Sequence, residues 1–135
     1  MDSSNRALDT HDYARLLLAA IRLLNGGVAL LAPQLLARRL AQDPGRNPAL
    51  LYALRMFGIR TVLIGADLAL QSGAQRTETV QRAVVIHASD TIAAALATST
   101  GRLPGASGLL ITLISAFNTV LALYASAGTR GRPAG

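Results

Sequence analysis

Apolar residues gather in four stretches of the chain, and short segments rich in Gly, Pro and Arg separate them. The stretches cover about residues 15–32, 50–72, 82–98 and 107–126. A membrane-spanning helix needs roughly 20 predominantly apolar residues, and about 17 is the lower limit. The second and fourth stretches meet this length easily, whereas the first and third are shorter and carry ionisable side chains. The pattern therefore predicts four membrane-spanning helices.

Helical phase, at about 100° per residue, gives each stretch a stripe of small or polar residues opposite an apolar side. On the second stretch this stripe consists of Gly58, Thr61, Gly65 and Ala69. Membrane helices pack through such small residues, whereas the helices of a soluble bundle have charged outer faces. We therefore predict an all-α fold. It is a four-transmembrane-helix bundle with short loops, one domain over residues 1–135, and a disordered tail over 127–135.

Composition supports a membrane protein. Hydrophobic residues make up 51% of the chain and charged residues 15%, whereas a soluble domain carries about 25% charged residues. The net charge of +6 could indicate nucleic-acid binding. However, Arg is scattered along the chain and aromatic residues make up only 4%, so there is no platform on which bases could stack. The expected partner is the lipid bilayer rather than nucleic acid.

Several ionisable or strongly polar residues lie within the apolar stretches. A charge at the bilayer centre costs about 2.5–3.5 kcal/mol, so it normally faces the bundle and finds a partner. An antiparallel hairpin of the second and third stretches puts Arg60 level with Asp90, which predicts an ion pair with Arg22 as a second cation. The predicted intramembrane polar cluster contains Arg22, Arg55, Arg60, Asp67, His87, Asp90 and Asn118.

This cluster has two interpretations. It is either a buried network that fixes the register of the helices, or a relay or binding site. In the second case it would carry protons or anions, or bind an acidic headgroup, with His87 and Asp90 as a titrating pair. His87 and Asp90 alone do not complete a metal site, so we expect no metal. The chain has no Cys and no catalytic or cofactor-binding motif, so we expect neither an enzyme nor a cofactor.

The connector after the first stretch combines a proline with a pair of arginines. Pro33 suits the first turn of a helix, and Arg38 and Arg39 follow it closely. The segment is either a short interfacial helix whose arginines contact lipid headgroups or a solvated connector. His11, before the first stretch, is expected in an exposed tail.

Orientation follows the distribution of Arg in the short loops. With four spans, one side of the membrane holds Arg6, Arg15, Arg76, Arg82, Arg130 and Arg132. The other side holds Arg38, Arg39, Arg46 and Arg102. Six against four favours both termini on the cytoplasmic side of the plasma (inner) membrane.

The run from Arg55 to Arg60, followed by Gly65, resembles a signature of small bacterial membrane proteins of the DoxX-like four-helix families and related domains of unknown function. The resemblance extends to an Arg- and Gly-rich first span that ends in Ala32-Pro33 and contains Arg22, and to a third span with His87 before Asp90. It implies a four-helix membrane bundle and no particular activity.

Taken together, these features predict a non-enzymatic accessory or scaffold subunit in the membrane. It would pack against lipid or other membrane proteins, or associate with itself through the small-residue faces. The alternative is a small transporter or proton-coupled carrier in which Arg22, Arg60, His87 and Asp90 line a polar path. An intramembrane enzyme acting on lipid or quinone ranks third.

Overall fold

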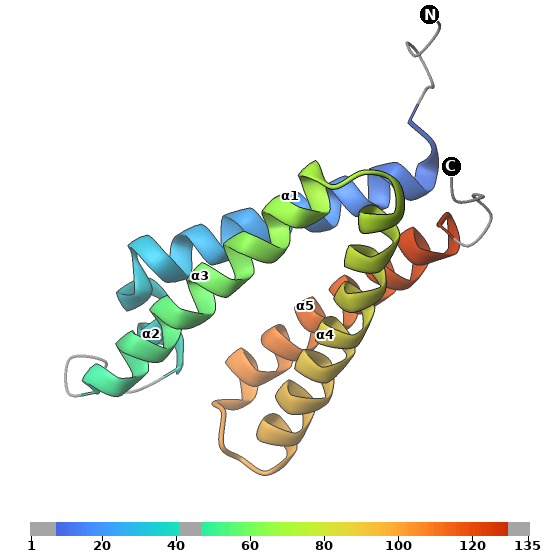
Figure 1. The fold of residues 1–135 in the computed structure, drawn as a ribbon. Helices are drawn as coiled ribbons and strands as arrows, with labels where there is room; N and C mark the ends of the chain where they lie inside the picture. The colour runs from blue at the N-terminus through green and yellow to red at the C-terminus, as the bar shows by residue number, and fades with distance from the viewer. Residues whose placement is uncertain (1–7, 41–46, 130–135) are drawn as a thin grey trace, which may run out of the picture.

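Helices make up nearly all of the computed structural model, which describes residues 8–40 and 47–129. This confirms the all-α prediction. The described residues form α1 (Thr10–Leu31), α2 (Pro33–Leu40), α3 (Pro48–Leu70), α4 (Gly73–Ser99) and α5 (Gly105–Ala127), as Figure 1 shows.

Local sequence signals set the helix ends. The Asp9 carboxylate caps α1 by accepting from the Asp12 amide at 2.8 Å, and the Asn47 side chain caps α3 by accepting from the Leu50 amide at 3.0 Å. Such capping oxygens satisfy amide groups that have no partner within the helix. Gly73 has a φ of +57°, which glycine adopts without strain. It allows the chain to reverse within two residues between α3 and α4.

Among the described residues, three helices are long and apolar enough to cross a membrane, namely α1, α3 and α5. They imply contact with a lipid bilayer and indicate a small multi-pass membrane protein. The predicted third span lies within α4, which is not one of the three. The segment before that span was expected to be a loop, but Gly73–Ser99 is one continuous helix of 27 residues. Its first turns are polar because they contain Gln75, Arg76 and Glu78.

α1 packs antiparallel along α3, and glycines allow the close approach. A Cβ atom at Gly58 would lie 2.6 Å from the backbone nitrogen of Leu30, and one at Gly26 would lie 2.8 Å from that of Val62. The buried side of α3 consists of Gly58, Thr61, Gly65 and Leu68. The small-residue stripe predicted for this helix is therefore its contact with α1.

α4 packs antiparallel along α5. The hydroxyls of Thr91 and Thr119 share a hydrogen bond at 2.9 Å, and a Cβ atom at Gly108 would lie 2.5 Å from the Thr98 hydroxyl. The small-residue faces of α4 and α5 are thus used against each other. The chain itself therefore occupies these two faces.

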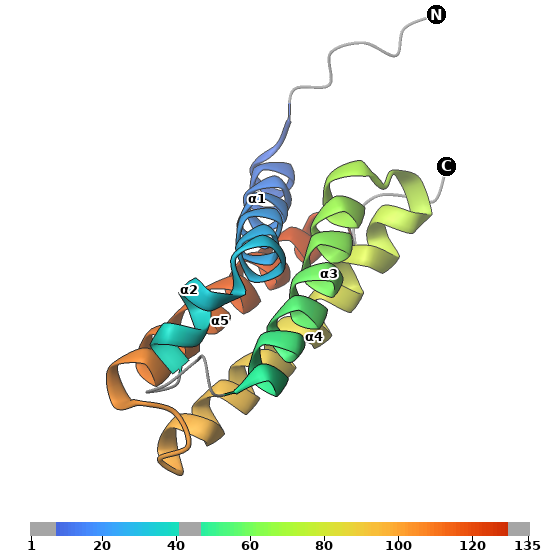
Figure 2. The same cartoon turned by 90° about the vertical axis from the view of Figure 1, so that its left-hand side faces the viewer.

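The two helix pairs join at one end and diverge toward the other, so the molecule has the shape of a V (Figure 1). At the joined end, a core forms from Ala14, Leu18, Ala19, Leu68, Val80, Ala83, Ala122 and Ala125. Figure 2 shows the same helices turned by 90°. The four long helices thus form two packed pairs with a core at one end. Small contact faces hold each pair tightly. The two pairs meet at the joined end in a core in which most side chains are alanine.

Two peripheral predictions have different outcomes. The residues after Pro33 do form a helix, α2, in which Pro33 and Ala37 are buried and Arg38 and Arg39 are exposed. The disordered tail was expected from residue 127. However, Ala127 ends α5, and the Thr129 hydroxyl donates to the carbonyl of Ser126 at 2.8 Å. The remainder of that predicted tail, 130–135, lies outside the described residues.

Candidate functional site

Arg22 connects the two helix pairs at the middle of α1. Its Nη2 donates to Asp90 Oδ2 on α4 at 3.1 Å. The same guanidinium lies against the His87 ring, with Nε 3.2 Å from Nε2 and Nη2 2.6 Å from Nδ1. His87 and Asp90 are three residues apart and share one face of α4. We call these three residues the Arg22 cluster.

Hydrogen-bond chemistry fixes the form of the imidazole in this arrangement. A guanidinium can only donate, and a neutral imidazole has one acceptor nitrogen, whereas a protonated one has none. His87 therefore accepts one hydrogen bond from Arg22 in its neutral form, and only one of the two nitrogen contacts is a hydrogen bond. Arg22 and His87 are buried, while the Asp90 side chain is 42% exposed. The imidazole of the cluster is therefore shielded from the surroundings of the protein, whereas the carboxylate is accessible to them.

Asn118 on α5 lies at about the depth of the Arg22 cluster. Its neighbour Thr119 is bonded to Thr91, which is one turn beyond His87 on α4. Asn118 is 5% exposed, and its Oδ1 has no hydrogen-bond partner among the described residues. A buried acceptor is therefore left unsatisfied close to the middle of the helices.

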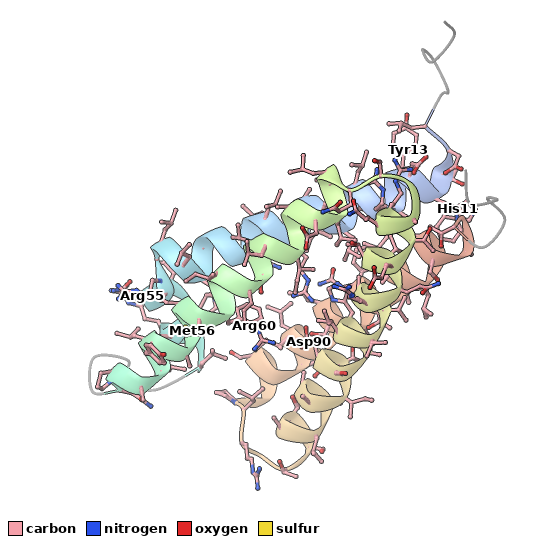
Figure 3. The ribbon with its side chains drawn as sticks, in the orientation of Figure 1. His11, Tyr13, Arg55, Met56, Arg60 and Asp90 are labelled. Atoms are coloured by element: carbon pink, nitrogen blue, oxygen red, sulfur yellow. The ribbon has the colours of Figure 1, made fainter. Side chains whose placement is uncertain are left out.

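The expected ion pair between Arg60 and Asp90 does not form, since Asp90 is paired with Arg22. Arg22 lies close to both of the helices that carry the expected pair. A Cβ atom at Gly65 of α3 would lie 3.1 Å from Arg22 Cβ, so Gly65 and His87 are both level with Arg22. However, α3 packs on α1 and has few contacts with α4. Figure 3 shows Arg60 and Asp90 on these two separate helices.

The remaining charges of the predicted cluster lie on the surface of α3. Arg55, Arg60 and Asp67 are all exposed, and none of them has an ion pair with the residues that the structure describes. Arg60 and Asp67 lie on the side of α3 opposite Gly58 and Gly65. Figure 3 shows Arg55 extending away from the helices. The structure thus divides the predicted cluster into an internal part and an exposed part.

A second polar group, at the joined end of the V, was missed by the analysis of the sequence. The buried Arg15 side chain donates to the carbonyl of Leu68, and lies 3.4 Å from that of Ala69. Cations are favourable at the C-terminal ends of helices because carbonyls there have no partner within the helix. Arg15 therefore caps α3. The polar side chains before the first apolar stretch were a signal for this arrangement.

Residues near the start of α1 bind α4 and α5. Asp12 pairs with Arg76 of α4 at 3.2 Å. His11 stacks on Tyr124 of α5 with 4.4 Å between ring centroids, and its Nδ1 is 2.8 Å from the Tyr124 carbonyl oxygen. His11 was expected in an exposed tail, but it belongs to α1 because Asp9 starts the helix before it. These contacts close the joined end.

The chemistry of the whole arrangement is that of hydrogen bonding and charge. No group of three or more His, Asp or Glu side chains in residues 8–40 and 47–129 is placed to hold a metal ion. Comparison with protein-family models, curated proteins and solved structures finds no match to this chain. The resemblance to DoxX-like families therefore gains no support and stays a prediction from the residues.

Proposed function

We propose that this chain is a non-enzymatic accessory or scaffold subunit that crosses the plasma membrane four times, with both termini on the same side of the membrane. It acts by packing against another membrane chain. The links between helices are short, so no separate soluble domain is present to carry out chemistry in the described part of the chain.

The packing of α4 supports its role as the fourth span. α4 runs along α5 from the Thr91–Thr119 hydrogen bond to the contact of Thr98 with Gly108. A helix that lies along a membrane-spanning partner passes through the same depth. The charged and polar residues of its middle, His87 and Asp90, face Arg22 rather than lipid. This pairing lowers the cost of placing them in the membrane.

The surface of the helices also fits a lipid environment. Large apolar side chains point outward along the candidate spans, and a soluble protein rarely exposes so continuous an apolar surface. Those more than half exposed include Leu24, Leu31, Leu63, Leu70, Leu109, Leu113 and Val120.

The observation that carries the proposal is the exposed charged face of α3. Arg60 and Asp67 lie on a candidate span and have no partner within the described chain. Charges at such depth are costly unless they pair or face water. A neighbouring membrane chain that supplies the opposite charges removes that cost. Association through α3 is therefore the function we infer.

The proposal is tested by extracting the protein in mild detergent after cross-linking in the membrane. The wild type should run as a complex larger than the monomer, and the Arg60→Leu/Asp67→Leu variant should run as a monomer. Arg102→Leu, an exposed arginine in the link between α4 and α5, serves as the control and should keep the complex. A wild type that runs only as a monomer would contradict the proposal.

One observation favours the alternative, a small proton-coupled carrier. The Asp90 carboxylate is 42% exposed, and the unsatisfied Oδ1 of Asn118 lies at a similar depth. An open carboxylate beside a buried imidazole can exchange protons with water or a substrate. In proteoliposomes, a carrier would dissipate an imposed pH gradient, and Asp90→Asn would abolish this activity. On the scaffold proposal neither protein dissipates the gradient.

A further inference from the structure

The exposed face of α3 carries both signs of charge. Arg60 and Asp67 are seven residues apart, so they lie on the same side of the helix, about 10 Å from each other along its axis. Leu63 lies between them and is 60% exposed. A face with one cation and one anion can form two ion pairs with the same face of a second copy, provided that the second copy presents the two charges in the reverse order.

We propose that the chain on this face is a second copy in the opposite orientation across the membrane. Arg60 of each copy pairs with Asp67 of the other. The inference rests on the proposed function, since it names the partner that covers α3.

The order of the charges decides the orientation. Copies with the same orientation present Arg60 at one depth and Asp67 about 10 Å away, so each residue meets its own counterpart and like charges face each other. In an inverted pair centred between Leu63 and Ile64, Arg60 is level with Asp67 of the other copy. The same contact is then made twice about a twofold axis, which gives a closed interface.

The depth of this centre suits inversion. An inverted pair keeps both copies within the bilayer only if its twofold axis lies near the middle of the membrane. The midpoint of α1 is close to Ile21, and a Cβ atom at Gly65 would lie 3.1 Å from both the Ala19 carbonyl oxygen and Arg22 Cβ. The midpoint of α3 itself is Ile59. The level of the α1 midpoint therefore meets α3 near Gly65, and the midpoint of α3 is Ile59. The proposed twofold axis, between Leu63 and Ile64, lies between these two levels.

The arginine distribution permits both orientations. With four spans, six arginines lie on one side and four on the other. Orientation is set mainly by an excess of Lys and Arg in the cytoplasmic loops, and this excess is small here. The small-residue faces of the four long helices are already used within the described chain, whereas the charged face of α3 remains open to a second copy.

Because the chain contains no Cys, single cysteines can report the orientation. Met56 and Leu70 are exposed on the proposed face, and the inverted pair brings Met56 of one copy level with Leu70 of the other. Differently tagged Met56→Cys and Leu70→Cys proteins, expressed together, should form a mixed disulfide in the membrane. Neither variant alone should form one, because its own counterpart lies about 20 Å away. Disulfides formed by Met56→Cys alone would show a same-orientation pair and overturn the proposal.

Charge exchange separates a second copy from a different partner. Arg60→Asp alone should abolish the cross-linked dimer, and the exchange variant Arg60→Asp/Asp67→Arg should restore it, because each copy then offers the same charges in reversed positions. With a different protein as partner, the exchange variant would lose the complex. That result would refute the inference and leave the proposed function standing. A wild type that is monomeric throughout would refute both.

Discussion

Arg22 of α1 donates a hydrogen bond to Asp90 of α4 across 3.1 Å, and this ion pair lies between two helix pairs that diverge beyond it. The core of the molecule lies on the other side, toward the joined end. The Arg22 cluster is therefore the polar boundary between the packed end and the open end.

Replacing Arg22 should destabilise the contact between α1 and α4. Arg22→Leu deletes the partner of both His87 and Asp90 and should lower stability by about 3 kcal/mol. This is the lower end of the range for a buried pair, because the Asp90 carboxylate is partly exposed. Asp90→Leu leaves Arg22 buried without its carboxylate and should also destabilise. The double variant should recover much of the loss, since no charge is left unpaired. Thermal unfolding in detergent measures all three, with Arg102→Leu as the control. Additive losses in the double variant would mean that the two residues act separately.

A methyl group at Gly58 should separate α1 from α3. The new Cβ would lie 2.6 Å from the Leu30 nitrogen and 2.8 Å from the Gly26 carbonyl oxygen, and backbone atoms cannot move aside as a side chain can. We expect Gly58→Ala to cost about 1–3 kcal/mol, as overpacking does elsewhere. Gly27→Ala is the matched control, because nothing lies within 4 Å of its Cβ position. It should be neutral or stabilise the helix by up to about 1 kcal/mol. Equal melting temperatures for the two variants would contradict the α1–α3 packing.

Arg15 should matter more than an exposed arginine of the same chain. Arg15→Leu removes the cation from the last carbonyls of α3, and hydrogen bonds to charged groups contribute about 1.5–3 kcal/mol. Arg15→Lys should retain part of this stability, because it keeps the charge and loses the planar fork. Hydrogen exchange would locate the effect, with faster exchange in the last turn of α3. Unchanged exchange there in Arg15→Leu would show that Arg15 does not cap the helix.

Replacing Asn118, unlike the substitutions above, should not lower the stability of the protein. Because its buried Oδ1 has no partner among the described residues, Asn118→Leu should remove an unsatisfied group that costs about 1–3 kcal/mol. The variant should therefore melt at the same temperature as the wild type or higher. A clear loss of stability would show that a water molecule or a ligand bonds to this oxygen in the membrane.

The sequence predicted those features that depend on neighbours along the chain. The helical fold follows from the spacing of apolar residues, and the stripe of Gly58, Thr61 and Gly65 was identified from phase alone. The sequence could not show which helices lie side by side. The second and third apolar stretches were expected to pack as a hairpin, but α3 packs on α1 and α4 packs on α5. Asp90 therefore meets Arg22 instead of Arg60.

The extent of α4 was missed for a related reason. Gln75, Arg76 and Glu78 indicate a loop when hydropathy is the only signal. In the structure these residues continue the helix, and Arg76 is bound by Asp12 at the start of α1. A contact between distant parts of the chain supports a polar helical turn that local composition does not favour.

The divergence of the two helix pairs also affects the lipid around them. A body that is narrow at one end and broad at the other occupies more area in one leaflet than in the other, and a flat bilayer must deform to accommodate it. Two inverted copies place one narrow end and one broad end in each leaflet, so their areas balance. The monomer should accordingly partition toward curved membranes, whereas the inverted pair should be indifferent to curvature.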